Sequence, residues 1–348
     1  MTVSLFLDEM PLSSFEVNKR MRQCACTADC IIVFLEKKRE IPKKNMINDD
    51  VETQIRNTIE QEIGNFTNDS AMMIAYERAL ETAKGPTKAL IHDPFAKYLQ
   101  GPKGKILSED FGEQTSVPFG FSGWPDFHRT WTVVRTKFID DTIHDVQNDG
   151  IQLLQLVNLG AGLDTRPFRL KCYENFEGCF DVDMEAINTI KEKVFHVIVE
   201  KDPSCKPLCK SLENVSMDLL DTNKNLCSEL SKIGFLKNSP SIFVAEGLIM
   251  YLGSGKERFL KEVSDSASPG SVFILNFMEN ADEETGRAMD PNYMSKNDLI
   301  KVLKDEGWDD TSMAINRFGD SKLSYGRYPT DRFDKTCFFS FLVCRKAR

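Results

Sequence analysis

The segment 157–166, Val-Asn-Leu-Gly-Ala-Gly-Leu-Asp-Thr-Arg, constrains the fold of this 348-residue chain more than any other segment. It directly follows an apolar run at 153–156. A short buried strand that leads into Gly-x-Gly lets the backbone approach a nucleotide-like cofactor closely, because glycine has no Cβ to obstruct the approach. Gly160, Ala161 and Gly162 are therefore candidate cofactor-binding residues at the first turn of a doubly wound α/β fold.

Short apolar runs alternate with helical segments after this turn, and the first runs end in acidic residues. The runs lie at 180–182, 215–217, 242–245 and 272–277. Asp183, Asp218 and Glu246 follow the first three of them. Because the carboxyl ends of parallel strands meet at one edge of a sheet, we expect these acids to line one ligand site. The pattern predicts a Rossmann-like α/β fold with helices on both faces, and the last run, 337–344, predicts a late strand joined by a hairpin.

A helix is predicted from Asp126 onward, and it carries an arginine beside its apolar stripe. Arg135 lies four residues after Trp131 and three before Phe138, which places it on the same side of the helix as these two rings. A guanidinium at the edge of a buried face needs an anionic partner or a path to water. The position of Arg135 fits a structural salt bridge, snorkelling to the surface, or a clamp on a carboxylate.

Local patterns mark the other elements. A helix is predicted over 67–83, with Gly85 as its end. The glycine- and proline-rich segment 101–125 predicts a loop that covers a pocket or lies on the surface. The patterns Ser-x-x-Glu at 254–257 and Ser-x-x-Asp at 295–298 resemble capping boxes and predict two helix starts.

Charge and cysteine spacing exclude several classes of protein. The net charge of −9 argues against general binding of nucleic acid, because phosphate contacts need clustered Lys and Arg. No apolar run approaches the roughly 18 residues of a membrane span, so we expect no membrane segment and a cytoplasmic protein. Cys24, Cys26 and Cys30 lack the paired spacing of zinc sites, and we expect no metal. Residues 1–65 are interpreted as an N-terminal extension, helical or partly disordered.

The acids after the strands discriminate between cofactors. Asp183 lies about 20 residues after the glycine turn, where a carboxylate receives the ribose hydroxyls of a nucleotide. Nicotinamide cofactors and S-adenosylmethionine both carry this ribose. A dinucleotide site needs a third glycine where this chain has Asp164 and Thr165, and an acid there repels a pyrophosphate. S-adenosylmethionine has no phosphate, and Asp218 is placed to accept a hydrogen bond from its adenine amino group. The residues therefore favour S-adenosylmethionine.

Two segments carry more specific motifs: Asn-Leu-Gly-Ala-Gly-Leu-Asp-Thr-Arg at 158–166 and Val-Ala-Glu-Gly-Leu-Ile-Met-Tyr-Leu at 244–252. Together they resemble the leucine carboxyl methyltransferase family of S-adenosylmethionine-dependent enzymes. The continuation at 164–170 resembles the bacterial members more than the eukaryotic enzymes that methylate a protein phosphatase. The resemblance covers residues 66–348, which we interpret as the methyltransferase domain. It implies a class I methyltransferase fold with a mostly parallel seven-stranded sheet and an added helical lid.

The resemblance also implies a role for each candidate cofactor-binding residue. It places Arg135 at the cofactor's carboxylate, Gly160 and Gly162 along its methionine part, Asp183 at the ribose, Asp218 and Leu219 beside the adenine, and Glu246 near the amino end.

The expected activity is O-methyl transfer to a carboxylate or hydroxyl of a small molecule. The alternatives are methylation of the C-terminal leucine carboxylate of a protein phosphatase catalytic subunit, and a non-catalytic relative that binds the cofactor. A carboxylate, with a pKa of about 4, is already ionised at neutral pH, whereas a hydroxyl needs a general base. Tyr251, just after the fourth strand, is a candidate for positioning the acceptor. We expect His92 and His128 to be structural.

Overall fold

The computed structural model describes residues 50, 53–55, 57, 69–111, 121–150, 152–280, 283–330 and 337–347. By its internal contacts the chain divides into two units, Met1–Asn48 and Asp49–Arg348. The first unit, with Cys24, Cys26 and Cys30, lies outside the described residues. The N-terminal extension predicted for 1–65 therefore stays a prediction.

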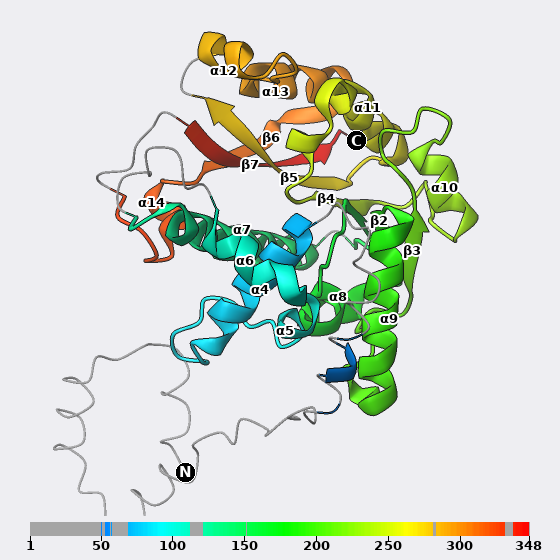
Figure 1. Ribbon diagram of the computed structural model, residues 1–348. Helices are drawn as coiled ribbons and strands as arrows, with labels where there is room; N and C mark the ends of the chain where they lie inside the picture. Colours follow the sequence, from blue (N-terminus) through cyan, green and yellow to red (C-terminus); the bar gives the residue numbers. More distant parts are fainter. Residues whose placement is uncertain are drawn as a thin grey trace, which may run out of the picture. The chain divides into compact units, whose positions relative to one another are not determined.

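One seven-stranded sheet runs through the described part of the second unit, in the spatial order β3-β2-β1-β4-β5-β7-β6 (Figure 1). Its strands are β1 (Gln155–Leu159), β2 (Gly178–Asp183), β3 (Leu212–Ser216), β4 (Ser241–Ala245), β5 (Val272–Asn280), β6 (Trp308–Arg317) and β7 (Cys337–Lys346). Strands β1 to β5 pair in parallel, whereas β7 is antiparallel to both of its neighbours. The predicted mostly parallel α/β sheet is confirmed. The strand order reverses between β1 and β4, which is where open α/β sheets bind ligands.

The helices include the predicted ones and several short additions. They are α4 (Asp69–Ala83), α5 (Ala96–Leu99), α6 (Gly101–Glu109), α7 (Trp124–Asn148), α8 (Arg166–Arg169), α9 (Glu185–Lys201), α10 (Leu226–Lys232), α11 (Lys256–Ser266), α12 (Glu283–Met289), α13 (Lys296–Asp305) and α14 (Ser321–Ser324). The capping box at Ser295 is confirmed. The one predicted at 254–257 is wrong, because α11 begins at Lys256 after Gly255 without a side-chain cap. None of the helices in the described ranges is long and apolar enough to cross a membrane.

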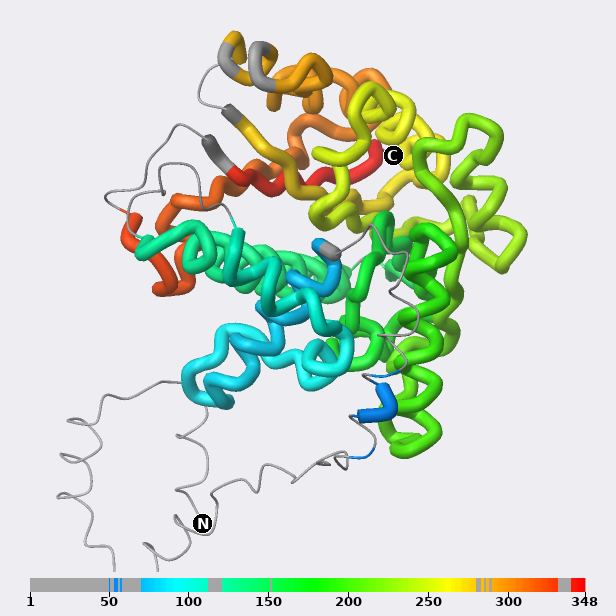
Figure 2. Tube along the Cα trace, viewed as in Figure 1, coloured from blue at the N-terminus to red at the C-terminus, as the bar shows by residue number. Residues whose placement is uncertain are grey.

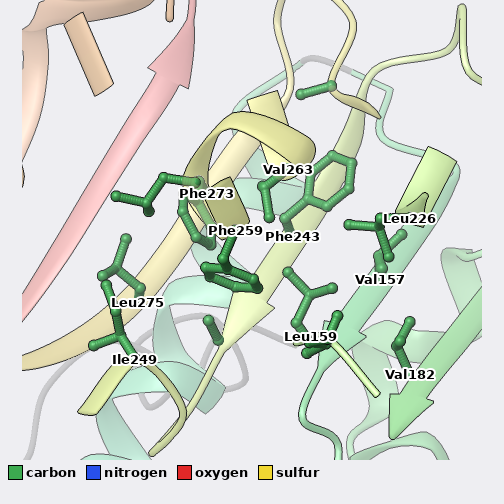
Figure 3. Packing of buried hydrophobic residues seen from close by; sticks show 14 of the residues in the cluster. Val157, Leu159, Val182, Leu226, Phe243, Ile249, Phe259, Val263, Phe273 and Leu275 are labelled. Carbon is green, nitrogen blue, oxygen red and sulfur yellow. The ribbon is translucent and has the colours of Figure 1, made fainter. Parts of the chain in front are cut away.

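Alternate residues of the strands build a core on each face of the sheet. Val157 and Leu159 of β1 belong to the face that α10, α11 and α13 cover, and Figure 3 shows Phe259 of α11 in this layer. Leu156 belongs to the opposite face, where Trp131 of α7 packs. Successive side chains of a strand point to opposite faces, which explains why one short strand serves both cores.

Helices α4, α5 and α6, which precede α7 in the chain, form a group beside it (Figure 2). The ring of Trp131 in α7 stacks on Phe339 of β7, with ring centroids 4.5 Å apart, and its centroid lies 5.3 Å from that of Phe341. This aromatic contact anchors α7 on the sheet. Other residues on the side of α7 that carries Trp131 face the carboxyl ends of the strands.

The loop predicted for 101–125 is wrong in its first part, which forms helix α6. Pro102 lies in the first turn of this helix, where its missing N–H costs no hydrogen bond. Gly104 faces α4 so closely that an added Cβ would lie 2.5 Å from the backbone oxygen of Met72. Pro102 is therefore compatible with the start of this helix, and Gly104 allows the helix to pack tightly against α4. Residues 112–120 lie outside the described part of the chain.

Candidate functional site

A cavity of about 590 Å³ lies at the carboxyl edge of β1, β2 and β4, and α4 and α7 contribute to its wall. All of the residues that the sequence singles out for the site line it: Arg135, Gly160, Ala161, Gly162, Asp183, Asp218, Leu219, Glu246 and Tyr251. The fold thus brings the acids that follow the strands to one cavity, as expected from parallel pairing. His92 is exposed and does not line the cavity.

The glycine turn needs its glycines for conformation and for space. Gly160 and Gly162 have φ angles of +62° and +52°, a left-handed region that other residues rarely adopt. A Cβ on Gly160 would lie 2.8 Å from Cδ1 of Leu248. The amide of Ala161 donates to the carbonyl of Val182 at 3.1 Å and so ties the turn to β2. The backbone of the turn therefore forms part of the cavity wall itself.

Asp183 is fixed at the end of β2 by two backbone amides. Its Oδ2 accepts a hydrogen bond from Gly162 N and its Oδ1 accepts one from Met184 N, both at 2.7 Å. Burial nevertheless raises the pKa of this carboxyl, because these hydrogen bonds only partly offset the desolvation of the charge. Each oxygen keeps a second lone pair, which is the arrangement that can receive a pair of hydroxyl groups.

Asp218 and Leu219 follow β3 at another part of the wall. The carboxylate of Asp218 accepts a hydrogen bond from Leu220 N at 2.8 Å and is otherwise exposed. Leu219 is buried. An exposed carboxylate beside an apolar side chain suits a flat heterocycle that carries an amino group.

Glu246, at the end of β4, holds two arginines. Its Oε1 accepts a hydrogen bond from Nε of Arg135 at 2.8 Å, and its Oε2 accepts one from Nη1 of Arg166 at 2.7 Å. Burial alone would raise the pKa of Glu246, but the guanidinium groups of Arg166 and Arg135 outweigh it and lower the pKa to about 2. Arg135 thus lies in a buried salt bridge, which is one of the roles expected for it, and it also lines the cavity.

Sequence reasoning did not foresee how many charges meet behind the glycine turn. Arg166 and Arg169 form salt bridges with acids behind the turn, and the partner that they share is Asp140 of α7. Arg166 also bonds Asp164, and Asn158 donates to the same carboxylate at 2.9 Å. Arg166 lies in the continuation of the motif at 164–170, and this position is the signal that could have identified it as a centre of the site.

Tyr251 and His128 differ in how they lie at the cavity. Tyr251 is 67% exposed, so it lies at the rim. His128, expected to be structural, is 9% exposed and lines the cavity, with Nδ1 bonded to the buried carboxylate of Glu77. Its spacing of three and seven residues from Trp131 and Arg135 puts all three on one side of α7, which is a signal that the sequence contained.

Comparison with known proteins identifies the family of the chain. The family model described as leucine carboxyl methyltransferase matches residues 71–262, more than half of the chain. A relative from Mycobacteroides abscessus is 28% identical over 297 residues, which covers 78% of this chain and 91% of the relative. Another from Streptomyces avermitilis is 28% identical over 274 residues, covering 74% and 87% respectively. Both are provisionally named S-adenosyl-L-methionine-dependent methyltransferases.

Among solved structures, the [4+2]-cyclase SpnF aligns with a TM-score of 0.45 at 11% identity, over 70% of this chain and 92% of that one. An alignment at this level says nothing about the acceptor. The family match and the related sequences carry the assignment. The chain belongs to the leucine carboxyl methyltransferase family and is an S-adenosylmethionine-dependent methyltransferase.

Proposed function

We propose that this enzyme transfers the methyl group to an oxygen, either carboxylate or hydroxyl, of a small-molecule acceptor. The observation that carries the proposal is that the glycine turn, the strand-end acids and the Arg135–Glu246 pair all line the same cavity. We further propose that residues 66–348 form the methyltransferase domain and that residues 1–65 are an extension of it.

The polar groups of the cavity suit the parts of the cofactor. Nη1 and Nη2 of Arg135 make no hydrogen bond with the described residues, so they are available to a carboxylate. The neighbouring carboxylate of Glu246 suits an ammonium group. We assign Asp183 to the ribose hydroxyls, Asp218 and Leu219 to the adenine, and Gly160, Ala161 and Gly162 to the methionine chain. A Cβ on Gly162 would meet no atom closer than 3.9 Å, so the backbone there is open to a ligand.

The protein's contribution to the reaction is to position the acceptor and to exclude water. The bound cofactor supplies a methyl group on a sulfonium, and attack on it is a direct displacement. Holding both reactants in line supplies about 7–11 kcal/mol of the barrier. The buried ring of Trp131 and the glycine turn lie in the wall of one cavity, which offers both reactants a surface of buried residues.

A peptide C-terminus is the second candidate acceptor. The description of the matching family favours it, because that description names a leucine carboxylate. Incubation with a protein phosphatase catalytic subunit and radiolabelled cofactor tests it. Transfer of label to the subunit would replace the small-molecule proposal, and transfer only to small molecules would support it.

Asp183→Asn is expected to weaken binding of S-adenosylhomocysteine by about 10- to 100-fold, because a hydrogen bond to a charged group contributes about 1.5–3 kcal/mol. Isothermal titration calorimetry on the full chain measures this affinity. Asp221→Asn, which changes a carboxylate outside the cavity, is the matched control and should bind like the wild type. Equal affinity of Asp183→Asn and wild type would contradict the assigned role of Asp183.

A further inference from the structure

The part of the cavity lined by aromatic residues carries a histidine to which the proposed function gives no role. His128 lies on α7, seven residues before Arg135, which corresponds to about 10 Å along the helix axis. Both side chains line the cavity. If Arg135 binds the methionine end of the cofactor, the distance between Arg135 and His128 along α7 leaves room for an acceptor beside His128.

A buried carboxylate fixes the imidazole of His128. Nδ1 lies 2.9 Å from both Oε1 and Oε2 of Glu77 on α4. The hydroxyls of Ser108 and Thr132 donate to the same carboxylate, so Glu77 is held from three sides. When Nδ1 of a neutral imidazole donates to a carboxylate, Nε2 carries no hydrogen and can accept one. Nε2 of His128 has no hydrogen-bond partner among the described residues.

One aromatic ring contacts this histidine, and three others line the same cavity. The ring of Phe111 lies 4.1 Å from the imidazole, measured between ring centroids. Trp131 stacks on Phe339 with an angle of 25° between the ring planes. These three rings and Trp124 all line the cavity. Flat apolar faces of this kind favour an aromatic ring, because a stacked pair gains about 0.5–1.5 kcal/mol beyond its buried area.

The charges of the wall favour a neutral acceptor group. Every arginine that lines the cavity has an acidic partner: Arg78 with Asp93, Arg135 with Glu246, Arg166 with Asp140, Asp164 and Glu246, and Arg169 with Asp140. No lysine lines it among the described residues. The open Nη atoms of Arg135 are assigned to the carboxylate of the cofactor. A second carboxylate, beside Nε2 of His128, would therefore meet a lone pair and no remaining cation, whereas a hydroxyl would meet a hydrogen-bond acceptor.

We propose that the acceptor is a phenol-type hydroxyl and that Nε2 of His128 is the catalytic base that receives its proton. This inference rests on the proposed function and narrows it. The O–H bond of the acceptor breaks, and the proton passes to Nε2. The oxygen forms a bond to the methyl carbon, whose bond to sulfur breaks and leaves a neutral thioether. The imidazolium then loses its proton to water. A phenol, with a pKa of about 10, is protonated at neutral pH and needs this base.

The test uses the full chain with cofactor and matched acceptor pairs. Monocyclic, bicyclic and tricyclic phenols are each assayed beside the arenecarboxylic acid of the same ring system, and mass spectrometry separates aryl methyl ethers from methyl esters. We expect ethers. His128→Gln should lower the rate of ether formation by about 10²- to 10⁴-fold, the usual contribution of a general base. The control His144→Gln, an exposed histidine on the same helix, should leave the rate unchanged.

Calorimetry with S-adenosylhomocysteine separates the possible failures. A wild-type chain that does not bind it overturns the proposed cofactor site. A wild type that binds it but forms methyl esters, or no aryl ether, overturns only the phenol assignment. Equal ether formation by His128→Gln and wild type overturns the role of His128.

The tautomer of His128 gives a readout that does not depend on activity or on the folding of a variant. Long-range proton–nitrogen NMR correlations of the wild type should show hydrogen on Nδ1 and none on Nε2 for this ring. Hydrogen on Nε2 and none on Nδ1 would overturn the assignment of His128 as the base.

Discussion

Replacing Arg166 with methionine is expected to lower the free energy of unfolding by about 3–5 kcal/mol, the usual cost of removing one partner from a buried ion pair. Arg166 is 3% exposed and bonds three carboxylates, those of Asp140, Asp164 and Glu246. Methionine keeps most of the apolar length of the side chain. The loss therefore reports three buried carboxylates that each have one cation fewer, and not a cavity in the packing.

The size of this effect follows from the position of Arg166 between three elements. Asp140 belongs to α7, Asp164 to the glycine turn, and Glu246 follows β4. Burial opposes the charge of Arg166, but the three carboxylates outweigh it and raise the pKa of the guanidinium well above its ordinary value. Arg166 therefore stays charged at neutral pH. It links the turn to the helix that carries Arg135 and His128.

Urea denaturation of the full chain measures the prediction, with Arg287→Met as the matched control. Arg287 pairs with Asp298 across an exposed surface, where ion pairs contribute about 0–1 kcal/mol. Arg166→Lys keeps the charge but loses the planar fork, so we expect an intermediate loss. A loss for Arg166→Met no larger than that for Arg287→Met would show that the buried network does not stabilise the fold.

The strands and their terminal acids could be predicted from the sequence because local patterns determine them. The apolar run before Gly160 and the acids after the next three runs are short-range features. Parallel pairing then brings their ends together without further information. The strand β6, by contrast, was missed. Apart from the buried Trp308, its side chains are half-buried or exposed without regular alternation, so it lacks the pattern that marks a half-buried strand.

The partners of the charged residues could not be predicted in the same way. Asp140 and Arg166 are 26 positions apart, and only the packing of α7 against the turn joins them. The same holds for Glu77 and His128, 51 positions apart. The repulsion of a pyrophosphate by Asp164, expected from the sequence, is also reduced, because Arg166 compensates its charge. Local patterns indicate which residues are polar, whereas long-range contacts decide which charges are neutralised.

Glu246→Gln is expected to lower the free energy of unfolding by about 3 kcal/mol at neutral pH, because a shift of one pKa unit corresponds to about 1.4 kcal/mol. The pKa of Glu246 is lowered from 4.5 to about 2 in the folded protein. A carboxyl with a depressed folded pKa stabilises the protein above its unfolded pKa. That stabilisation disappears as the pH falls through the folded pKa.

The difference between wild type and Glu246→Gln should therefore shrink on acidification, to about 2 kcal/mol near pH 3.5 and below about 1 kcal/mol near pH 2. Asp183 acts in the opposite sense, because burial raises its pKa, but its contribution is present in both proteins and cancels in the difference. Urea denaturation at a series of pH values gives the curve. Glu200→Gln on the exposed surface of α9 should show no such dependence. A difference that stayed constant down to about pH 2 would mean that the pKa of Glu246 is the same in the folded and unfolded states, and that its ion pairs with Arg135 and Arg166 do not stabilise the fold.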